Sequence, residues 1–153
     1  MRNLTDAELE EKWRKLNSSN YRVTSHATPR YNCLAFANGD ERNWWESHPY
    51  GSKVYWPPSL SREDSLANWV RIFESEGYTE CNNRDPEPGK HKVALYVDLD
   101  DMSPTHVAIS TGHKWKSKLG KLQDIEHDSL DLLEGYSGYE YGIVELVLEK
   151  VVQ

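Results

Sequence analysis

The 153-residue chain has no long apolar run and no apolar segment near its N-terminus, which reads MRNLTDAELEEKW. The first absence excludes a membrane-spanning helix from our expectations, and the second excludes a Sec signal peptide. The two cysteines, Cys33 and Cys81, are too few for a disulfide framework. We therefore expect a reduced cytoplasmic protein with no membrane partner, while export by a route without a Sec signal stays open.

Basic side chains are also scarce, with 18 Lys and Arg against 25 Asp and Glu and a formal net charge of -7. The acidic excess lies in residues 77–153, which hold 14 acidic and 8 basic side chains. An acidic surface repels phosphate backbones, so we expect no nucleic-acid partner.

Aromatic residues are plentiful, since six Trp and nine Tyr accompany only two Phe. Many of them lie in residues 40–60, where no clean hydrophobic period is visible among the Pro and Gly residues. This pattern predicts a long, ordered loop that covers one side of a cleft. Trp44 and Trp45 in this loop are either packed anchors or a wall of the substrate site.

The first half of the chain shows helical signals. Thr5 and Glu8 form a capping box for a helix that we expect to end near Asn17, followed by a loop over 17–30. Asn32 is a good N-cap for a short helix over 33–37. A third helix follows in EDSLANWVRIFESEG, residues 63–77, with Ser61 and Asp64 as its capping residues.

The second half changes to a period of two, which is typical of strands. Helices followed by an antiparallel sheet indicate one α+β domain over residues 1–153. The expected strands are 91–99, 105–111, 113–120 and 141–152, with a short helix at 128–135.

Cys33 is the first candidate for chemistry, because it opens the short helix over 33–37. The free N–H groups and the dipole of a helix N-terminus stabilise a thiolate and an oxyanion. The alternative is that Cys33 is a small apolar side chain in the core, as free cysteines often are.

A thiolate nucleophile needs a histidine base, and His106 at the start of the strand over 105–111 is the best candidate. The third member should come from the adjacent strand, where alternation places Lys114, Lys116 and Lys118 toward water and Ser117 on the buried face. His127 is the other candidate for this place.

The motifs YNCLAFANGD, KVALY, THVA, SKLG and IEH resemble the papain-like superfamily of thiol hydrolases, and within it the NlpC/P60 group. They are most similar to an uncharacterised bacterial family with these motifs. The resemblance implies a papain-like fold and a cysteine peptidase, amidase or acyl transferase acting on a peptide or protein. It assigns catalysis to Cys33, His106 and either Ser117 or His127.

In this interpretation the Cys33 N–H, with Asn32, binds the oxyanion, and Asn32, Trp44 and Trp45 contact the substrate. A serine in the third place departs from the usual His, Asn, Gln or Asp of papain-like enzymes. The competing hypothesis is therefore a catalytically weak papain-like domain that binds a protein partner, as an immunity module does.

No cofactor is predicted, and the sequence favours no particular oligomeric state. A zinc site is disfavoured because no two of its candidate ligands have close spacing. Those candidates are Cys33, Cys81, His91 and His106.

Overall fold

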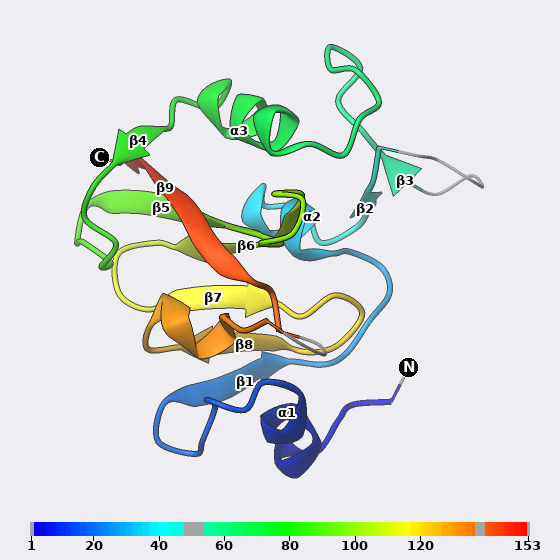
Figure 1. Cartoon of the computed structure of the whole chain (residues 1–153), viewed down its shortest axis with the longest axis vertical. Coiled ribbons are helices and arrows are strands. Elements are labelled where there is room, and N and C mark those ends of the chain that lie inside the picture. Colours follow the sequence, from blue (N-terminus) through cyan, green and yellow to red (C-terminus); the bar gives the residue numbers. More distant parts are fainter. Residues whose placement is uncertain (1, 48–53, 137–139, 153) are drawn as a thin grey trace.

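Alternating apolar residues in the second half of the chain form the centre of a seven-stranded antiparallel sheet (Figure 1). This computed structural model describes residues 2–47, 54–136 and 140–152. The mixed α+β class is confirmed. The strands of the sheet, in spatial order, are β1 (Tyr21–Ser25), β8 (Asp124–His127), β7 (Trp115–Lys118), β6 (Pro104–Ser110), β5 (Lys90–Val97), β9 (Ile143–Val151) and β4 (Thr79–Cys81).

The helices cover both faces of this sheet. In Figure 1 the sheet runs from β4 at the top to β1 at the bottom, with α3 at the upper end and α1 at the lower end. In the described part of the chain, no helix has the length and apolarity needed to cross a membrane. The helices are α1 (Asp6–Lys12), α2 (Cys33–Ala37), α3 (Leu66–Glu74) and the 3-10 helix η1 (Leu130–Leu133).

The central strand β5 shows how alternation divides the core into two clusters. Ala94 and Tyr96 pack with α1 and η1 on one face. Val93 and Leu95 pack with α2 and α3 on the opposite face. Because side chains alternate along a strand, a single strand supplies both clusters.

Helix α1 begins at the predicted capping box, since the Thr5 side chain accepts from the Glu8 N–H and the Glu8 side chain accepts from the Thr5 N–H. The predicted end near Asn17 is wrong, because the helix ends at Lys12. Past this point the Asn20 side chain binds the backbone of Asn17 and Lys15, and these bonds replace the helical ones.

The predicted loop over 17–30 contains strand β1, which pairs with β8 at the edge of the sheet. β8 was not expected as a strand either. Tyr21 and Val23 face His127 and Ile125 in this ladder. Strands of four or five residues with so few apolar positions carry too weak an alternation to be recognised before their partner is known.

Helix α3 begins at Leu66, so the predicted capping by Ser61 and Asp64 is wrong. Ser65 is the N-cap, and its side chain accepts from the Asn68 N–H. Asp64 instead accepts from the Trp69 indole at 2.9 Å, and the Ser61 carbonyl accepts from the Asn68 amide.

The predicted aromatic loop over 40–60 contains two short parallel strands, β2 (Trp44–Trp45) and β3 (Val54–Tyr55). Residues 48–53 of this prediction lie outside the described residues. The Asp40 carboxylate accepts from the Trp45 indole at 2.8 Å and so anchors β2.

Lys118 was expected to face water, and this prediction is wrong because the side chain is fully buried. Its ammonium donates to the carbonyl oxygens of Thr28, Gly120 and Leu122. Three carbonyls satisfy all three ammonium hydrogens, and this compensates part of the loss of hydration.

Gly142 connects Tyr141 to strand β9 and should tolerate no side chain. Its φ is +81°, and a Cβ atom would lie 2.0 Å from the Val97 carbonyl oxygen. We expect Gly142→Ala to lower the free energy of unfolding by about 1–3 kcal/mol more than Gly89→Ala. Gly89 is a matched control, because its φ is +80° with nothing within 4 Å of the added carbon. Urea denaturation of both variants measures the difference, and equal losses would contradict the steric argument.

Candidate functional site

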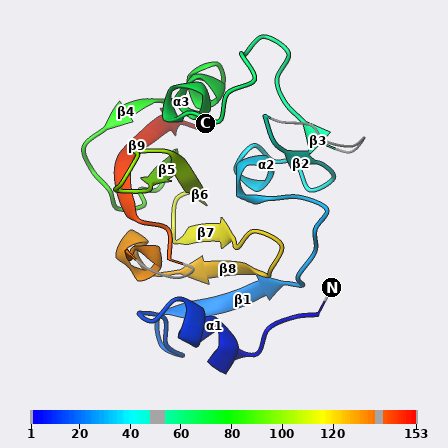
Figure 2. The same ribbon diagram turned by 45° about the vertical axis from the view of Figure 1, so that its right-hand side comes forward.

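Strands β6 and β7 pair over only two positions, Ile109 with Lys116 and Ser110 with Trp115. Toward the start of β6 the backbone ladder stops, and α2 contacts both strands there. Figure 2 shows α2 beside β6 and close to the end of β7. This arrangement places Cys33, the first residue of α2, where the two strands diverge.

Cys33 and His106 line one pocket of about 230 Å³. The two residues that the sequence suggested as nucleophile and base therefore line the same pocket. Trp44 and Trp45 line the same pocket and are partly buried. The floor is apolar, because Trp56 and Trp69 are buried side chains of the Cys33 cluster.

A chain of hydrogen bonds crosses three strands behind the pocket. His106 Nε2 lies 2.9 Å from Ser117 Oγ, and Ser117 Oγ lies 2.8 Å from His127 Nε2. His127 Nδ1 lies 3.0 Å from the Ser129 carbonyl oxygen. Ser117, and not His127, is therefore the direct partner of His106, and His127 continues the chain from Ser117.

The direction of these bonds follows from the last acceptor. A carbonyl only accepts, so His127 Nδ1 carries the hydrogen and its Nε2 is the acceptor in the neutral ring. Ser117 must then give its one hydroxyl proton to His127. Ser117 Oγ can only accept from His106, so His106 carries its hydrogen on Nε2 and leaves a lone pair on Nδ1.

His106 Nδ1 is buried, and it has no hydrogen-bond partner among the residues that the structure describes. A buried acceptor without a partner costs free energy, so such atoms are uncommon in folded proteins. The ring belongs to the lining of the Cys33 pocket. The hydrogen-bond chain therefore leaves Nδ1 of His106 unprotonated, on a residue that shares a pocket lining with Cys33.

Tyr141 fixes the plane of the imidazole and was not recognised from the sequence. Its ring stacks on His106 with a centroid distance of 4.1 Å and an interplanar angle of 4°. Tyr96 contacts the same imidazole edge-on, at 5.3 Å between centroids. Tyr141 lies 35 residues from His106 in the chain, and no local motif marks it, so only the folded sheet reveals the contact.

The expected thiolate at Cys33 is not supported, because burial raises the pKa of its thiol to about 11. Hydrogen bonding from the Val107 and Leu34 backbone and the charge of Lys118 lower the pKa, but by less than burial raises it. Helix α2 has only five residues, so its terminus contributes too little to compensate the lost hydration.

The histidines are neutral for the same reason. Burial, and then the neighbouring His127, hold the pKa of His106 well below 6.5. Burial lowers the pKa of His127 to about 4. The resting site therefore contains a neutral thiol and a neutral imidazole, and not a thiolate–imidazolium pair.

Asn32 has a positioning role that the sequence did not show in full. Its side-chain oxygen accepts from the N–H groups of Ala35 and Trp45, and its amide donates to the Trp45 carbonyl at 2.7 Å. These contacts cap α2 and join it to β2. At least one hydrogen of the Asn32 amide is therefore directed at the Trp45 carbonyl and not at the expected oxyanion.

Cys81 lies apart from this site. It ends β4, packs against the opposite core cluster and donates to the Asn83 carbonyl. Across 2–47, 54–136 and 140–152, no group of three or more His, Cys, Asp or Glu side chains is placed to hold a metal ion.

Comparison with known families matches residues 22–149 to the model of a family described as Domain of unknown function (DUF7689), and the chain belongs to this family. No curated protein matched the chain, and no solved structure matched it.

The tautomers of His106 and His127 can be tested directly. We expect ¹⁵N-resolved NMR at pH 7 to show the hydrogen on Nε2 of His106 and on Nδ1 of His127. On acidification His127 should titrate near pH 4, since burial lowers its pKa to about that value. A depressed histidine pKa means that the unfolded chain binds more protons below pH 6.5, so stability should fall as the pH drops from 6.5 toward 4. His127→Gln should lessen this fall, whereas a His127 pKa near 6.5 would contradict the buried neutral ring.

Cys33 should react slowly with a thiol probe at neutral pH. Because burial raises its pKa to about 11, the labelling rate of the native protein should increase with pH up to that value. Mass spectrometry after timed iodoacetamide labelling separates Cys33 from Cys81. Fast labelling of Cys33 that is already constant at pH 7 would show a preformed thiolate and contradict this description.

Proposed function

We propose that this member of the family is a cysteine hydrolase or acyl transferase that acts on a peptide or amide bond. Cys33 is the nucleophile, His106 the general base, and Ser117 and His127 the residues that set the tautomer of the base. The cytoplasm suits such an enzyme, because both cysteines are free thiols. No cofactor is needed for this chemistry.

The observation that carries the proposal is the unpartnered Nδ1 of His106. Its proton-free state follows from the hydrogen bonds of Ser117 and His127, and His106 is one of the residues that line the Cys33 pocket. A purely structural histidine would satisfy both ring nitrogens, since leaving one unpaired in the core has a cost. A general base needs the opposite arrangement, with one nitrogen fixed and the other free.

The reaction begins when Cys33 Sγ attacks the carbonyl carbon of the substrate and its proton moves to His106 Nδ1. The imidazolium then returns this proton to the leaving nitrogen as the C–N bond breaks, which leaves a thioester on Cys33. Water, or an acceptor amine in a transferase, attacks the thioester and gives a proton to Nδ1. Release of the acyl group breaks the C–S bond and returns the proton to Sγ.

Charge that develops on the carbonyl oxygen needs a donor beside the thiol. The first N–H groups of a helix have no intrahelical acceptor, and Cys33 contributes one of them at the start of α2. The Ser117 hydroxyl accepts from the imidazolium, and His127 behind it accepts the hydroxyl proton. This neutral relay orients the base but supplies no negative charge, in contrast to a carboxylate.

The papain-like interpretation of the fold also belongs to this proposal. A cysteine at a helix start followed by a histidine on an antiparallel strand supports it. The alternative is a papain-like domain that binds a partner without cleaving it. This alternative is supported by the neutral state of both groups at rest, because the raised pKa of Cys33 and the lowered pKa of His106 disfavour a preformed ion pair.

Acyl transfer to Cys33 tests the proposal. We expect the wild type to acquire an acyl adduct from a panel of peptide thioesters, and Cys33→Ala to acquire none. Ser117→Ala should slow acylation about 10²-fold or more, because His106 then loses the acceptor that fixes its tautomer. Intact-protein mass spectrometry measures both rates.

Ser110→Ala is the matched control, since Ser110 is a buried serine on β6 whose hydroxyl accepts from the Gly112 N–H and takes no part in the His106 chain of hydrogen bonds. It should acylate at the wild-type rate. If the wild type acquires no acyl adduct from any thioester of the panel, the binding alternative is favoured. If Ser117→Ala acylates at the wild-type rate, Ser117 and His127 have no part in the mechanism.

A further inference from the structure

The Cys33 pocket combines aromatic walls with acidic residues at its rim. Glu46 and Asp64 line it and are exposed residues, whereas Trp56 and Trp69 form a buried floor. No lysine or arginine lines the pocket among the residues that the structure describes. The buried Lys118 lies outside this lining and directs its ammonium at three carbonyls.

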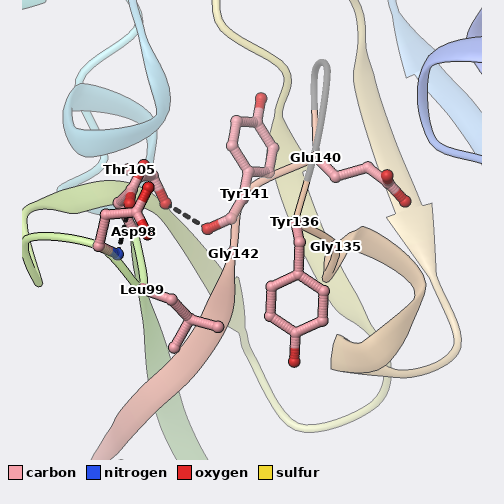
Figure 3. A pocket seen from close by; sticks show the side chains of 9 residues that line it. Asp98, Leu99, Thr105, Gly135, Tyr136, Glu140, Tyr141 and Gly142 are labelled. Carbon is pink, nitrogen blue, oxygen red and sulfur yellow. Dashed lines mark hydrogen bonds between the residues drawn. The ribbon is translucent and has the colours of Figure 1, made fainter.

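A second pocket of about 240 Å³ adjoins the first, since Thr105 and Tyr141 belong to both linings. Figure 3 shows Tyr141 rising from the chain beside Thr105, whose hydroxyl donates to the Tyr141 carbonyl at 2.6 Å. Asp98 and Asp100 line this second pocket, and again no described lysine or arginine does.

Four acidic side chains of these two pockets have no cationic partner in the part of the chain that the structure describes. Among the described residues, none of the carboxylates of Glu46, Asp64, Asp98 and Asp100 forms an ion pair. By contrast, Glu140 at the far wall of the second pocket is paired with Arg14. Four carboxylates without an ion pair to any described residue therefore favour a negative potential across the two neighbouring pockets.

Aromatic faces and carboxylates together are the chemistry that recognises an ammonium or guanidinium group. A cation over an indole face gains about 0.5–2 kcal/mol, and more when the site excludes water. His106, whose buried Nδ1 has no partner among the described residues, also lines this pocket and is an independent indication that a ligand completes the site. An amide proton donor or a reacting group of a substrate would satisfy it.

We infer that the two pockets form one substrate groove for a cationic peptide, with a lysine or arginine side chain beside the carbonyl that Cys33 attacks. The Trp-lined pocket holds the alkyl stem and the cationic head. The second pocket, beyond Thr105 and Tyr141, receives the continuing chain and favours further positive charge. This inference rests on the proposed function only in calling the peptide a substrate, because the groove would bind the peptide whether or not Cys33 cleaves it.

Binding to the Cys33→Ala protein tests the groove without catalysis. The probes are acetyl-Gly-Gly-Xaa-Gly-Gly-amide peptides with Xaa as Lys, norleucine or Glu, titrated against the intrinsic tryptophan fluorescence. We expect the Lys peptide to bind about tenfold more tightly than the norleucine peptide at low salt, and this preference to shrink at high salt. The Glu peptide should bind most weakly.

Neutralising the rim carboxylates should remove the preference. With Glu46→Gln and Asp64→Asn together, the Lys and norleucine peptides should bind within about threefold of each other. Asparagine at 64 keeps an oxygen acceptor for the Trp69 indole, so the floor is retained. Glu11→Gln with Glu145→Gln makes the same charge change at exposed positions outside both pockets and should leave the preference intact.

The outcomes separate this inference from the proposed function. Equal affinities for the three peptides, no binding by any of them, or equal loss in the control pair would overturn the cationic groove. Tight binding of the Lys peptide without acylation of the wild type would support the groove and overturn the enzyme. Acylation by neutral and cationic thioesters at equal rates would support the enzyme and overturn the groove.

Discussion

The site depends on the single hydroxyl proton of Ser117. Because a hydroxyl has one proton to give, its donation to His127 decides that His106 must donate to it in return. The Ser129 carbonyl fixes the direction of the whole chain from its far end. A backbone group thus determines which nitrogen of His106 is free. The stacked Tyr141 ring then keeps that nitrogen in its place.

Helix α2 contacts both β6 and β7 beside a ladder of only two residue pairs. If the strands paired along their full length, backbone hydrogen bonds would fill the space that α2 enters. Asn32 stabilises the position of α2 beside the diverging strands, because its side chain caps α2 and also binds β2 through the Trp45 backbone. The pocket therefore lies where the capped helix, the diverging strands and the aromatic wall meet.

The sequence allowed the short helix at Cys33 and the long apolar strands to be predicted, and it gave Ser117 as one of two candidate partners of His106. Each has a local signal: an N-cap, a period of two, or a polar residue on a buried face. β1 and β8 could not be predicted, because short edge strands acquire their stability only from pairing. Alternation wrongly predicted that Lys118 faces water, because nothing in the neighbouring sequence indicated the three carbonyls that accept from its ammonium. Tyr141 is a contact between distant segments and has no local signature.

Burial and catalysis oppose each other at Cys33, and the cationic groove offers a way to reconcile them. The same desolvation that raises the pKa of the thiol to about 11 also strengthens any charge interaction within the pocket. A cation about 5 Å from the sulfur, at an effective dielectric constant of about 20, stabilises the thiolate by about 3 kcal/mol, or about two pKa units. In the mechanism that we propose, a bound lysine or arginine side chain would therefore help to ionise Cys33 for its attack on the adjacent carbonyl. Without the substrate the thiol stays protonated and resistant to oxidation, because the thiolate is the reactive form. The neutral thiol and imidazole of the resting site favour a binding module. They are also what we expect of an enzyme whose thiol is ionised only when a cationic substrate binds.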